Sequence, residues 1–160
     1  LTLRHGRLPS KRGVHRFRRP GSVSGPAAVL IAYVSRRRTR FRSGKSTQCK
    51  LLVEHLNQQG IRAENMRFPD RTTTIGTMIN SYLQNTVDTD DQSIHLLFSA
   101  NRWECTKTIK DKLAQGITLV VDRYAFSGVA FSSAKGLDLA WCKSPDRGLP
   151  APDVVFFLGE

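Results

Sequence analysis

Acidic residues are absent from the first 50 positions of this 160-residue chain, although those positions hold 14 Lys and Arg residues. The remaining positions carry 11 Lys and Arg residues against 13 Asp and Glu residues, so that part of the chain is slightly acidic. The net charge of +12 therefore belongs to one segment, and it does not indicate that the whole chain binds nucleic acid specifically.

Long hydrophobic runs are also absent, and cysteine is scarce. The longest apolar run, residues 26–34, has about the length of a strand, whereas a membrane-spanning helix needs roughly 18 residues. We therefore expect no membrane segment. Cys49, Cys105 and Cys142 are odd in number and lack the spacing of a metal site, so we interpret them as reduced thiols of an intracellular protein.

Residues 1–25 are rich in Arg, Gly, Pro and Ser without a hydrophobic period, so we expect a disordered basic segment. Three interpretations are open: an organellar transit peptide, a translated upstream or intronic sequence, and an arm that binds nucleic acid loosely. The third has the least support, because the rest of the chain is not basic. We expect a cytoplasmic protein, with mitochondrial or nuclear targeting through this segment as alternatives.

Residues 26–160 are expected to form one domain in which strands alternate with helices. The pattern predicts strands at 27–34, 61–68, 117–121 and 153–158, and helices at 45–59, 72–84, 89–115, 124–134 and 137–142. A capping box, Thr89-Asp-Asp-Gln92, is predicted to open the long helix. This alternation predicts an α/β fold of the P-loop type, with a parallel sheet covered by helices on both faces. Because the last strand lies almost at the chain end, the domain is expected to be incomplete there.

A phosphate-binding motif follows the first predicted strand. Ser43-Gly44-Lys45-Ser46-Thr47 is the second half of a P-loop, G-x-x-x-x-G-K-[ST], and opens a helix. Backbone N–H groups at such a helix start attract phosphate, Lys45 can reach the β- and γ-phosphates, and the Ser46 hydroxyl can help to hold Mg²⁺. The first glycine of the motif is replaced by Thr39.

Charged residues follow two other predicted strands, at the edge of the sheet where ligands bind. Asp122 comes at the end of the strand at 117–121, as a Walker B acid does, and Arg123 is the next residue. Arg71 follows the strand at 61–68. Two arginines beside a P-loop indicate two phosphorylated ligands. The simpler alternative for Asp122 is an acid that faces water.

Phe98 and Arg102 lie four residues apart on the predicted long helix and therefore share one face. An aromatic ring and a guanidinium on one face could stack on a base and read its edge. From the spacing alone we favour the simpler interpretation, in which Phe98 and Trp103 are core residues and Arg102 is solvated.

Taken together, the motifs resemble eukaryotic thymidylate kinase (dTMP kinase). The similarity runs almost unbroken from about residue 43 to residue 158, and the stretches FSANRWE and DRYAFSGVAF are highly specific to this family. The matching stretches are FPDR at 68–71, LLFSANRWE at 96–104, VDRYAFSGVAF at 121–131, WCKSPD at 141–146 and LPAPD at 149–153.

This resemblance implies phosphoryl transfer from ATP to dTMP, giving dTDP, with Mg²⁺ as the metal and a homodimer of the complete domain. It implies catalytic roles for Arg42, Lys45 and Asp122, and metal binding by Ser46 and Asp122. The ATP-binding residues it implies are Arg42, Ser43, Gly44, Lys45, Ser46 and Thr47. The dTMP-binding residues it implies are Arg71 and Arg123 for the phosphate, Phe98 and Arg102 for the base, Phe131 for the sugar, and Ser127 and Gly128.

The chain departs from the family pattern at the start of the P-loop. The family has Glu-Gly-x-Asp-Arg in front of x-Gly-Lys-Ser, and this chain has Thr39 for the glycine and Phe41 for the aspartate, whereas Arg42 matches. The alternative interpretation is therefore a catalytically inactive truncated product, or a faulty gene model, of the same family.

Overall fold

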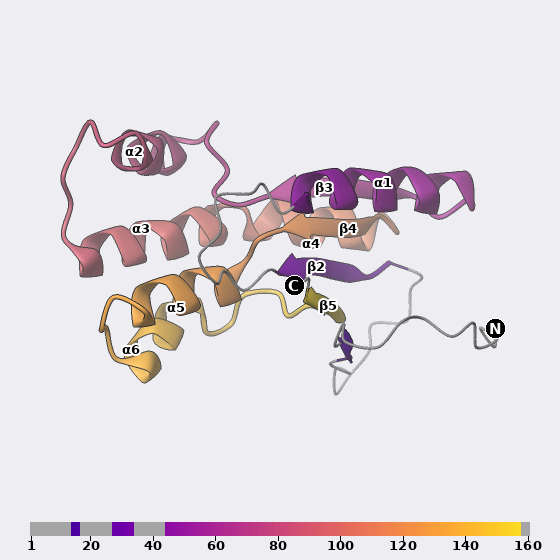
Figure 1. Ribbon diagram of the computed structural model, residues 1–160. Helices are drawn as coiled ribbons and strands as arrows, with labels where there is room; N and C mark the ends of the chain where they lie inside the picture. Colours follow the sequence, from indigo (N-terminus) through magenta and orange to yellow (C-terminus); the bar gives the residue numbers. More distant parts are fainter. Residues whose placement is uncertain (1–13, 17–26, 34–43, 158–160) are drawn as a thin grey trace.

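The computed structural model describes residues 14–16, 27–33 and 44–157, and a five-stranded sheet lies at its centre (Figure 1). The strand order in space is β1-β5-β2-β4-β3. The strands are β1 (Val14–Arg16), β2 (Val29–Tyr33), β3 (Ala63–Arg67), β4 (Thr118–Asp122) and β5 (Val154–Phe157). Each of the last four coincides with a strand predicted from the sequence; β2, β3 and β5 are slightly shorter than predicted, and β4 is shifted by one residue.

Four strands run parallel, and the fifth does not. β2 pairs in parallel with both β4 and β5, and β3 pairs in parallel with β4. β1 pairs antiparallel with β5, and its residues lie in the stretch for which the sequence predicted no packed element. An edge strand presents unpaired N–H and C=O groups that any extended segment can join, whatever its hydrophobic pattern. The remainder of residues 1–25 lies outside the described part of the chain.

The helices lie close to their predicted positions, with one correction. Instead of one helix over 89–115, two helices meet at Cys105, and Asp90 rather than Thr89 caps the first of them by accepting bonds from the Gln92 and Ser93 N–H groups. The helices are α1 (Lys45–Gln58), α2 (Thr74–Leu83), α3 (Asp91–Glu104), α4 (Thr106–Ala114), α5 (Ala125–Ser133), α6 (Leu139–Lys143) and the short 3₁₀ helix η1 (Ser144–Asp146). The break lets α4 pack on the sheet while α3 packs on α2 and α5.

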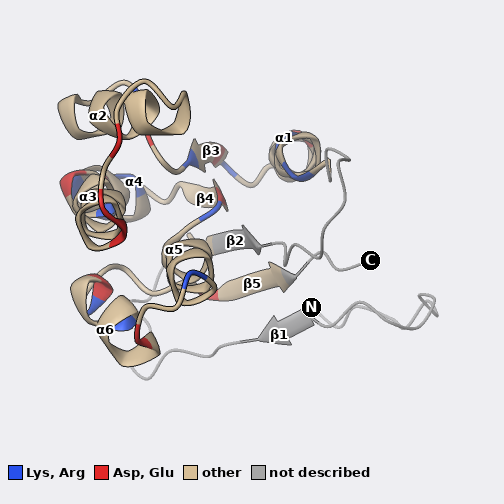
Figure 2. Ribbon diagram, turned by 60° about the vertical axis from the view of Figure 1, so that its left-hand side comes forward, with Lys and Arg blue, Asp and Glu red and all other residues tan. Residues whose placement is uncertain are grey.

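The core lies on both faces of β4, as expected for a buried central strand. Leu119 and Val121 belong to one apolar cluster, which includes Ile109 from α4. Val120 points the other way and packs with Cys49 from α1. Helices α1 and α4 therefore cover opposite faces of the sheet, and in Figure 2 β3 and β4 lie between them. The predicted α/β architecture, with helices on both faces, is confirmed.

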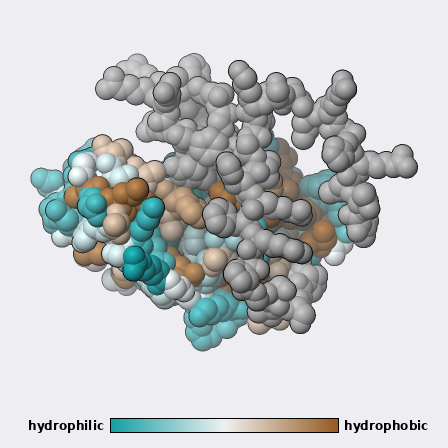
Figure 3. Space-filling view, turned by 90° about the horizontal axis from the view of Figure 1, so that it is seen from below, coloured by the Kyte–Doolittle hydropathy of each residue, from teal (hydrophilic) through white to brown (hydrophobic). Residues whose placement is uncertain are grey.

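Helices α2, α3, α5 and α6 form a separate group beyond the ends of the strands (Figure 1). The buried His95 ring connects three of them: Nε2 donates to the Cys142 carbonyl at 2.9 Å, and Nδ1 accepts from the Ser132 hydroxyl at 2.7 Å. A carbonyl can only accept, which places the proton of the neutral ring on Nε2. The surface seen from below, over α5 and α6, mixes hydrophobic and hydrophilic residues (Figure 3). None of the helices in residues 44–157 has the length and hydrophobicity of a membrane span.

A glycine is required where α2 meets the loop after β3. A Cβ atom at Gly76 would lie 1.7 Å from the backbone oxygen of Asp70. Because that oxygen belongs to the backbone, the clash could be relieved only by shifting the loop or the helix. We expect Gly76→Ala to lower the free energy of unfolding by about 1–3 kcal/mol or more. The measurement is urea denaturation, with the exposed neighbour Thr77→Ala as the control, expected within about 0.5 kcal/mol of the parent chain. Equal stability of both variants would contradict the close approach.

Candidate active site

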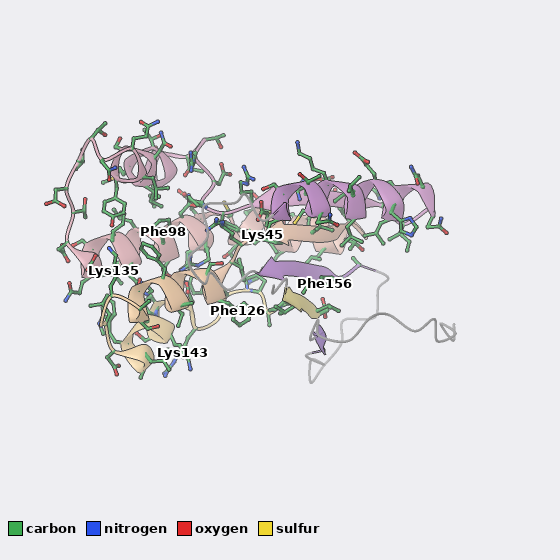
Figure 4. All side chains as sticks on the ribbon, in the orientation of Figure 1. Lys45, Phe98, Phe126, Lys135, Lys143 and Phe156 are labelled. Carbon is green, nitrogen blue, oxygen red and sulfur yellow. The ribbon has the colours of Figure 1, made fainter. Side chains whose placement is uncertain are left out.

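The start of α1 and the carboxyl ends of β3 and β4 meet beside α3 and α5. Gly44 caps α1 in the left-handed conformation, with φ of 65°, which glycine adopts without a steric penalty. Lys45 is the first helical residue and lies between the sheet and the neighbouring helices (Figure 4). Thr47 is exposed on the first turn. Arg42, Ser43, Thr39 and Phe41 lie outside the described residues.

Asp122 is the most deeply buried acid at this edge, with 2% of its surface exposed. Its Oδ2 accepts a 2.6 Å hydrogen bond from the Ser46 hydroxyl on α1. The same oxygen accepts from Arg67 at the end of β3, at 3.2 Å from Nε and 3.0 Å from Nη2. Parallel pairing sets this contact, because Arg67 and Asp122 are partners in the β3–β4 register. Helix α1 and strands β3 and β4 are thus joined at one carboxylate.

The residues at this carboxylate fit a divalent cation. Asp122 Oδ1 is buried and has no hydrogen-bond partner among the described residues, so one oxygen remains for a ligand. The Ser46 hydroxyl and a carboxylate are the hard oxygen donors that Mg²⁺ takes in nucleotide sites. The predicted pair Ser46 and Asp122 is therefore brought together, and both could hold the metal.

Arg67 was missed by the sequence analysis. Its position at the carboxyl end of β3 was the available signal, because basic residues at that edge of a parallel sheet face the ligands. The sequence analysis named Arg71 instead, which follows Phe68 and Pro69 at the end of the predicted strand. Arg67, Asp70 and Arg71 line an open cavity of about 490 Å³.

Two predicted phosphate-binding arginines lie exposed at the same edge. Arg123 follows β4 directly and has a φ of 71°, a left-handed conformation that is strained for a side chain of this size. Arg71 lies in the loop between β3 and α2. Both guanidinium groups extend from backbone positions beyond the sheet, where a phosphate could approach them.

A buried asparagine holds the loop that carries Arg71. Asn101 Oδ1 accepts the Asp70 N–H at 2.8 Å, and Nδ2 donates to the Asp70 carbonyl at 3.0 Å. Nδ2 also contacts Glu104 Oε1 at 2.7 Å and the Thr73 hydroxyl at 3.0 Å. This network, which the sequence analysis did not find, fixes the loop against α3.

The interpretation of Arg102 as a solvated residue is wrong. Arg102 is 2% exposed and forms a two-pronged ion pair with Asp146, at 3.0 Å from Nε and 2.8 Å from Nη2. Its guanidinium lies against Gly128, where a Cβ atom would be 3.3 Å from both terminal nitrogens. The resemblance to the family implies a role for Arg102 at the base, and that role stays a prediction; Asp146 holds the guanidinium in one orientation.

The other residues predicted for the base and sugar of dTMP lie on α3 and α5. Phe98 is half-buried one turn earlier on α3, and Ser127 is half-buried on α5. Phe131, farther along α5, is 51% exposed, and the Lys135 ammonium lies 5.0 Å from its ring centre. The core interpretation therefore holds only in part for Phe98 and does not hold for Trp103, which is 40% exposed.

Burial suppresses the ionisation of several groups near the site. It raises the pKa of the Tyr124 hydroxyl well above its ordinary value, and that oxygen has no hydrogen-bond partner in the described part of the chain. Burial raises the pKa of the Cys105 thiol to about 11, with the charge of Asp70 adding to the shift. Neither group therefore carries charge at neutral pH.

The fold and the Gly44–Ser46 turn beside Asp122 define a P-loop protein of the nucleoside monophosphate kinase type. A family model for thymidylate kinase matches residues 42–159. Thymidylate kinase of Homo sapiens is 63% identical over 118 residues, covering 73% of this chain and 56% of that protein. Thymidylate kinase of Schizosaccharomyces pombe is 62% identical over 117 residues, covering 73% and 56%. The chain belongs to the thymidylate kinase family.

The structural comparison agrees. The solved thymidylate kinase of Candida albicans matches with a TM-score of 0.73 at 38% identity, covering 82% of this chain and 62% of that one. That of Ehrlichia chaffeensis matches with a TM-score of 0.69 at 26% identity, covering 82% and 74%. The chain spans about half the length of the curated relatives it matches.

The Arg102–Asp146 pair should be worth far more to the fold than an exposed pair. Both side chains are almost fully buried, so Arg102→Met would leave a buried carboxylate that keeps the hydrogen bond from the Ser99 hydroxyl but loses its cationic partner. We expect a loss of about 3–5 kcal/mol in the free energy of unfolding. Lys107→Ala removes an exposed pair with Asp111 and should cost about 0–1 kcal/mol.

Denaturation by urea measures both changes. Adding Asp146→Leu to Arg102→Met removes the stranded charge, so the double variant should regain most of the loss. A double variant no more stable than Arg102→Met would show that the carboxylate is not the source of the cost.

Proposed function

We propose that this chain is the nucleotide-binding part of an enzyme that transfers the γ-phosphoryl group of ATP to dTMP, giving dTDP. The observation that carries the proposal is the Ser46–Asp122 contact at the start of α1, in a chain of the thymidylate kinase family. Phosphoryl transfer demands mainly positioning and charge neutralisation, and this edge of the sheet supplies cationic side chains for both.

On the ATP side, the N–H groups at the start of α1 and the Lys45 ammonium would bind the phosphates. Gly44 and Thr47 belong to the same turn, and Arg42 and Ser43 precede it in the sequence. Ser46 and Asp122 would hold Mg²⁺, which when bound neutralises charge on the β- and γ-phosphates. Lys45, Arg42 and Asp122 would be the catalytic residues.

On the dTMP side, Arg71 and Arg123 would bind the phosphate from two neighbouring loops. Phe98 would stack on thymine, and Arg102 would donate to its edge from a guanidinium that Asp146 already orients. Orienting a donor before the ligand arrives lowers the entropic cost of binding. Ser127, Gly128 and Phe131 on α5 would form the wall beside the sugar.

Phosphate recognition can be tested by binding alone. Arg71→Gln and Arg123→Gln should each lower the affinity for dTMP about 10- to 100-fold, because a charge-assisted hydrogen bond contributes about 1.5–3 kcal/mol. Thymidine, which lacks the phosphate, should bind the variants as it binds the parent chain. Calorimetry with both ligands, and Lys112→Gln as a distant control, decides the assignment. Equal losses for thymidine and dTMP would contradict it.

A second candidate is a family member without turnover, and the substitutions Thr39 and Phe41 favour it. We expect the 160-residue chain to turn over more slowly than about 1 s⁻¹ in a coupled ADP-release assay with dTMP. Thr39→Gly with Phe41→Asp should recover part of the rate, since it restores the glycine and the carboxylate of the family pattern. A rate of about 1 s⁻¹ or more without repair would contradict this reading of both substitutions.

We also propose that the protein forms a homodimer through α2 and α3. Met78, Leu96 and Leu97 help to line an open, largely apolar groove of about 620 Å³ between these helices. Met78 and Leu96 are 54% and 46% exposed. Helix α2 contains no charged residue, so it can pack on its own copy without burying like charges. A second copy of this chain is therefore the occupant that we propose.

Leu96→Glu would place a charge in the groove and should shift the chain from dimer to monomer. Sedimentation equilibrium measures this shift, with Leu139→Glu as the control, because Leu139 is 49% exposed on α6, away from the groove. A chain that is already monomeric at high concentration, or equal effects of both variants, would exclude the α2–α3 dimer.

We propose a cytoplasmic location, where ATP is abundant and thiols stay reduced. Cys49, Cys105 and Cys142 are buried and free. Burial raises the pKa of Cys49 to about 11, so this thiol beside the phosphate site is not reactive at neutral pH.

A further inference from the structure

Arg67 occupies the space between two residues that would hold the metal. Its Nη2 donates to the Ser46 hydroxyl and also lies 3.0 Å from Asp122 Oδ2. The Ser46 hydroxyl in turn donates to that same Asp122 oxygen at 2.6 Å. The guanidinium, the hydroxyl and the carboxylate therefore form a closed set of contacts around one point.

A divalent cation and this guanidinium cannot share that point. Asp122 Oδ2 already accepts from the Ser46 hydroxyl and from two nitrogens of Arg67. A cation that binds the Ser46 oxygen would compete with Arg67 Nη2, which donates to that oxygen. On either oxygen of Asp122, the free Oδ1 included, the cation would also lie close to the positive guanidinium and repel it. The Arg67 contacts must therefore break before the metal binds there.

The Arg67 side chain is exposed enough to leave this position. Its side chain is 59% exposed, whereas that of Asp122 is 3% exposed, so the arginine can swing into solvent while the carboxylate cannot. The exposed half of such a pair contributes little, because water screens and replaces it. Arg67 also lines the cavity that it shares with Arg71, so the released guanidinium would remain beside the phosphates.

We propose that Arg67 is an internal counter-ion for Asp122 that holds the metal position until a divalent cation arrives, and that cation binding displaces it. This inference rests on the proposed function, which assigns Mg²⁺ to Ser46 and Asp122. The displaced guanidinium then becomes a third arginine at the phosphate-binding edge, with Arg71 and Arg123. Arg67 therefore lowers the metal affinity of the nucleotide-free chain, and it supports phosphate binding once the metal has displaced it.

The first test measures Mn²⁺ affinity of the nucleotide-free chain by electron paramagnetic resonance. Arg67→Gln removes the competitor and should raise the affinity about 10-fold or more, because the lost charge lies directly on the carboxylate. Arg71→Gln removes a charge at the same edge that has no ion pair within the described residues, and it should raise the affinity less than about 3-fold. Equal effects of the two variants, an unchanged affinity in Arg67→Gln, or no Mn²⁺ binding to any of the chains would overturn the proposal.

The second test uses the unmodified chain, so it stands even if Arg67→Gln folds poorly. In an NMR titration with Mg²⁺, the Arg67 Nε–H signal should move to the position of a free guanidinium, with the same midpoint as metal binding. A signal that stays in place at saturating Mg²⁺ would refute displacement. Neither test involves dTMP or turnover, so failure here leaves the proposed kinase function open, and a failure of dTMP binding leaves the exchange at Asp122 intact.

Discussion

A charged carboxylate in the interior, Asp122, is the constraint on which the phosphate edge depends. An ionised carboxylate loses several kcal/mol of hydration when it is buried, so partners must replace the water. Ser46 from α1 and Arg67 from β3 supply those partners. Because β4 is the strand between β2 and β3, the same contacts hold the start of α1 in register with the sheet. One side chain thereby fixes both the start of α1 and the position that we propose for the metal.

The nucleoside half of the site depends on a second set of buried polar contacts. Asp146 orients Arg102, and Asn101 holds the loop of Arg71, so adjacent positions on α3 position the residues proposed for the base and for the phosphate. His95, nearer the start of α3, links this helix to Ser132 and Cys142. A helix whose inner face is polar can be buried only when each group has a partner, and here the partners are the loops that carry the candidate ligand-binding residues.

The sequence predicted β2, β4 and β5 well because each is a short apolar run rich in β-branched residues. The sequence predicted one helix over 89–115, whereas the structure has two that meet at Cys105. The helical spacing of apolar residues continues across that junction, so the spacing gave no sign of the break. Strand β1 was missed because an edge strand can be polar. Arg67 and Asn101 were missed because their contacts are made with partners distant in the chain, Asp122 and Asp70. The spacing of neighbouring residues does not indicate such partners. Arg102 was misjudged for the same reason, since its pairing with Asp146 spans 44 positions.

The charge balance at this edge explains why it suits phosphate in the absence of other ligands. Arg67, Arg71, Arg123 and Lys45 all lie at the ends of β3 and β4 or at the start of α1, and the N–H groups of that helix add to the positive potential. Asp122 offsets one of these charges and is itself enclosed. The remaining excess faces outward, because the arginines are exposed while the acid is buried. A polyphosphate that approaches this edge would therefore meet the exposed cations before the buried carboxylate.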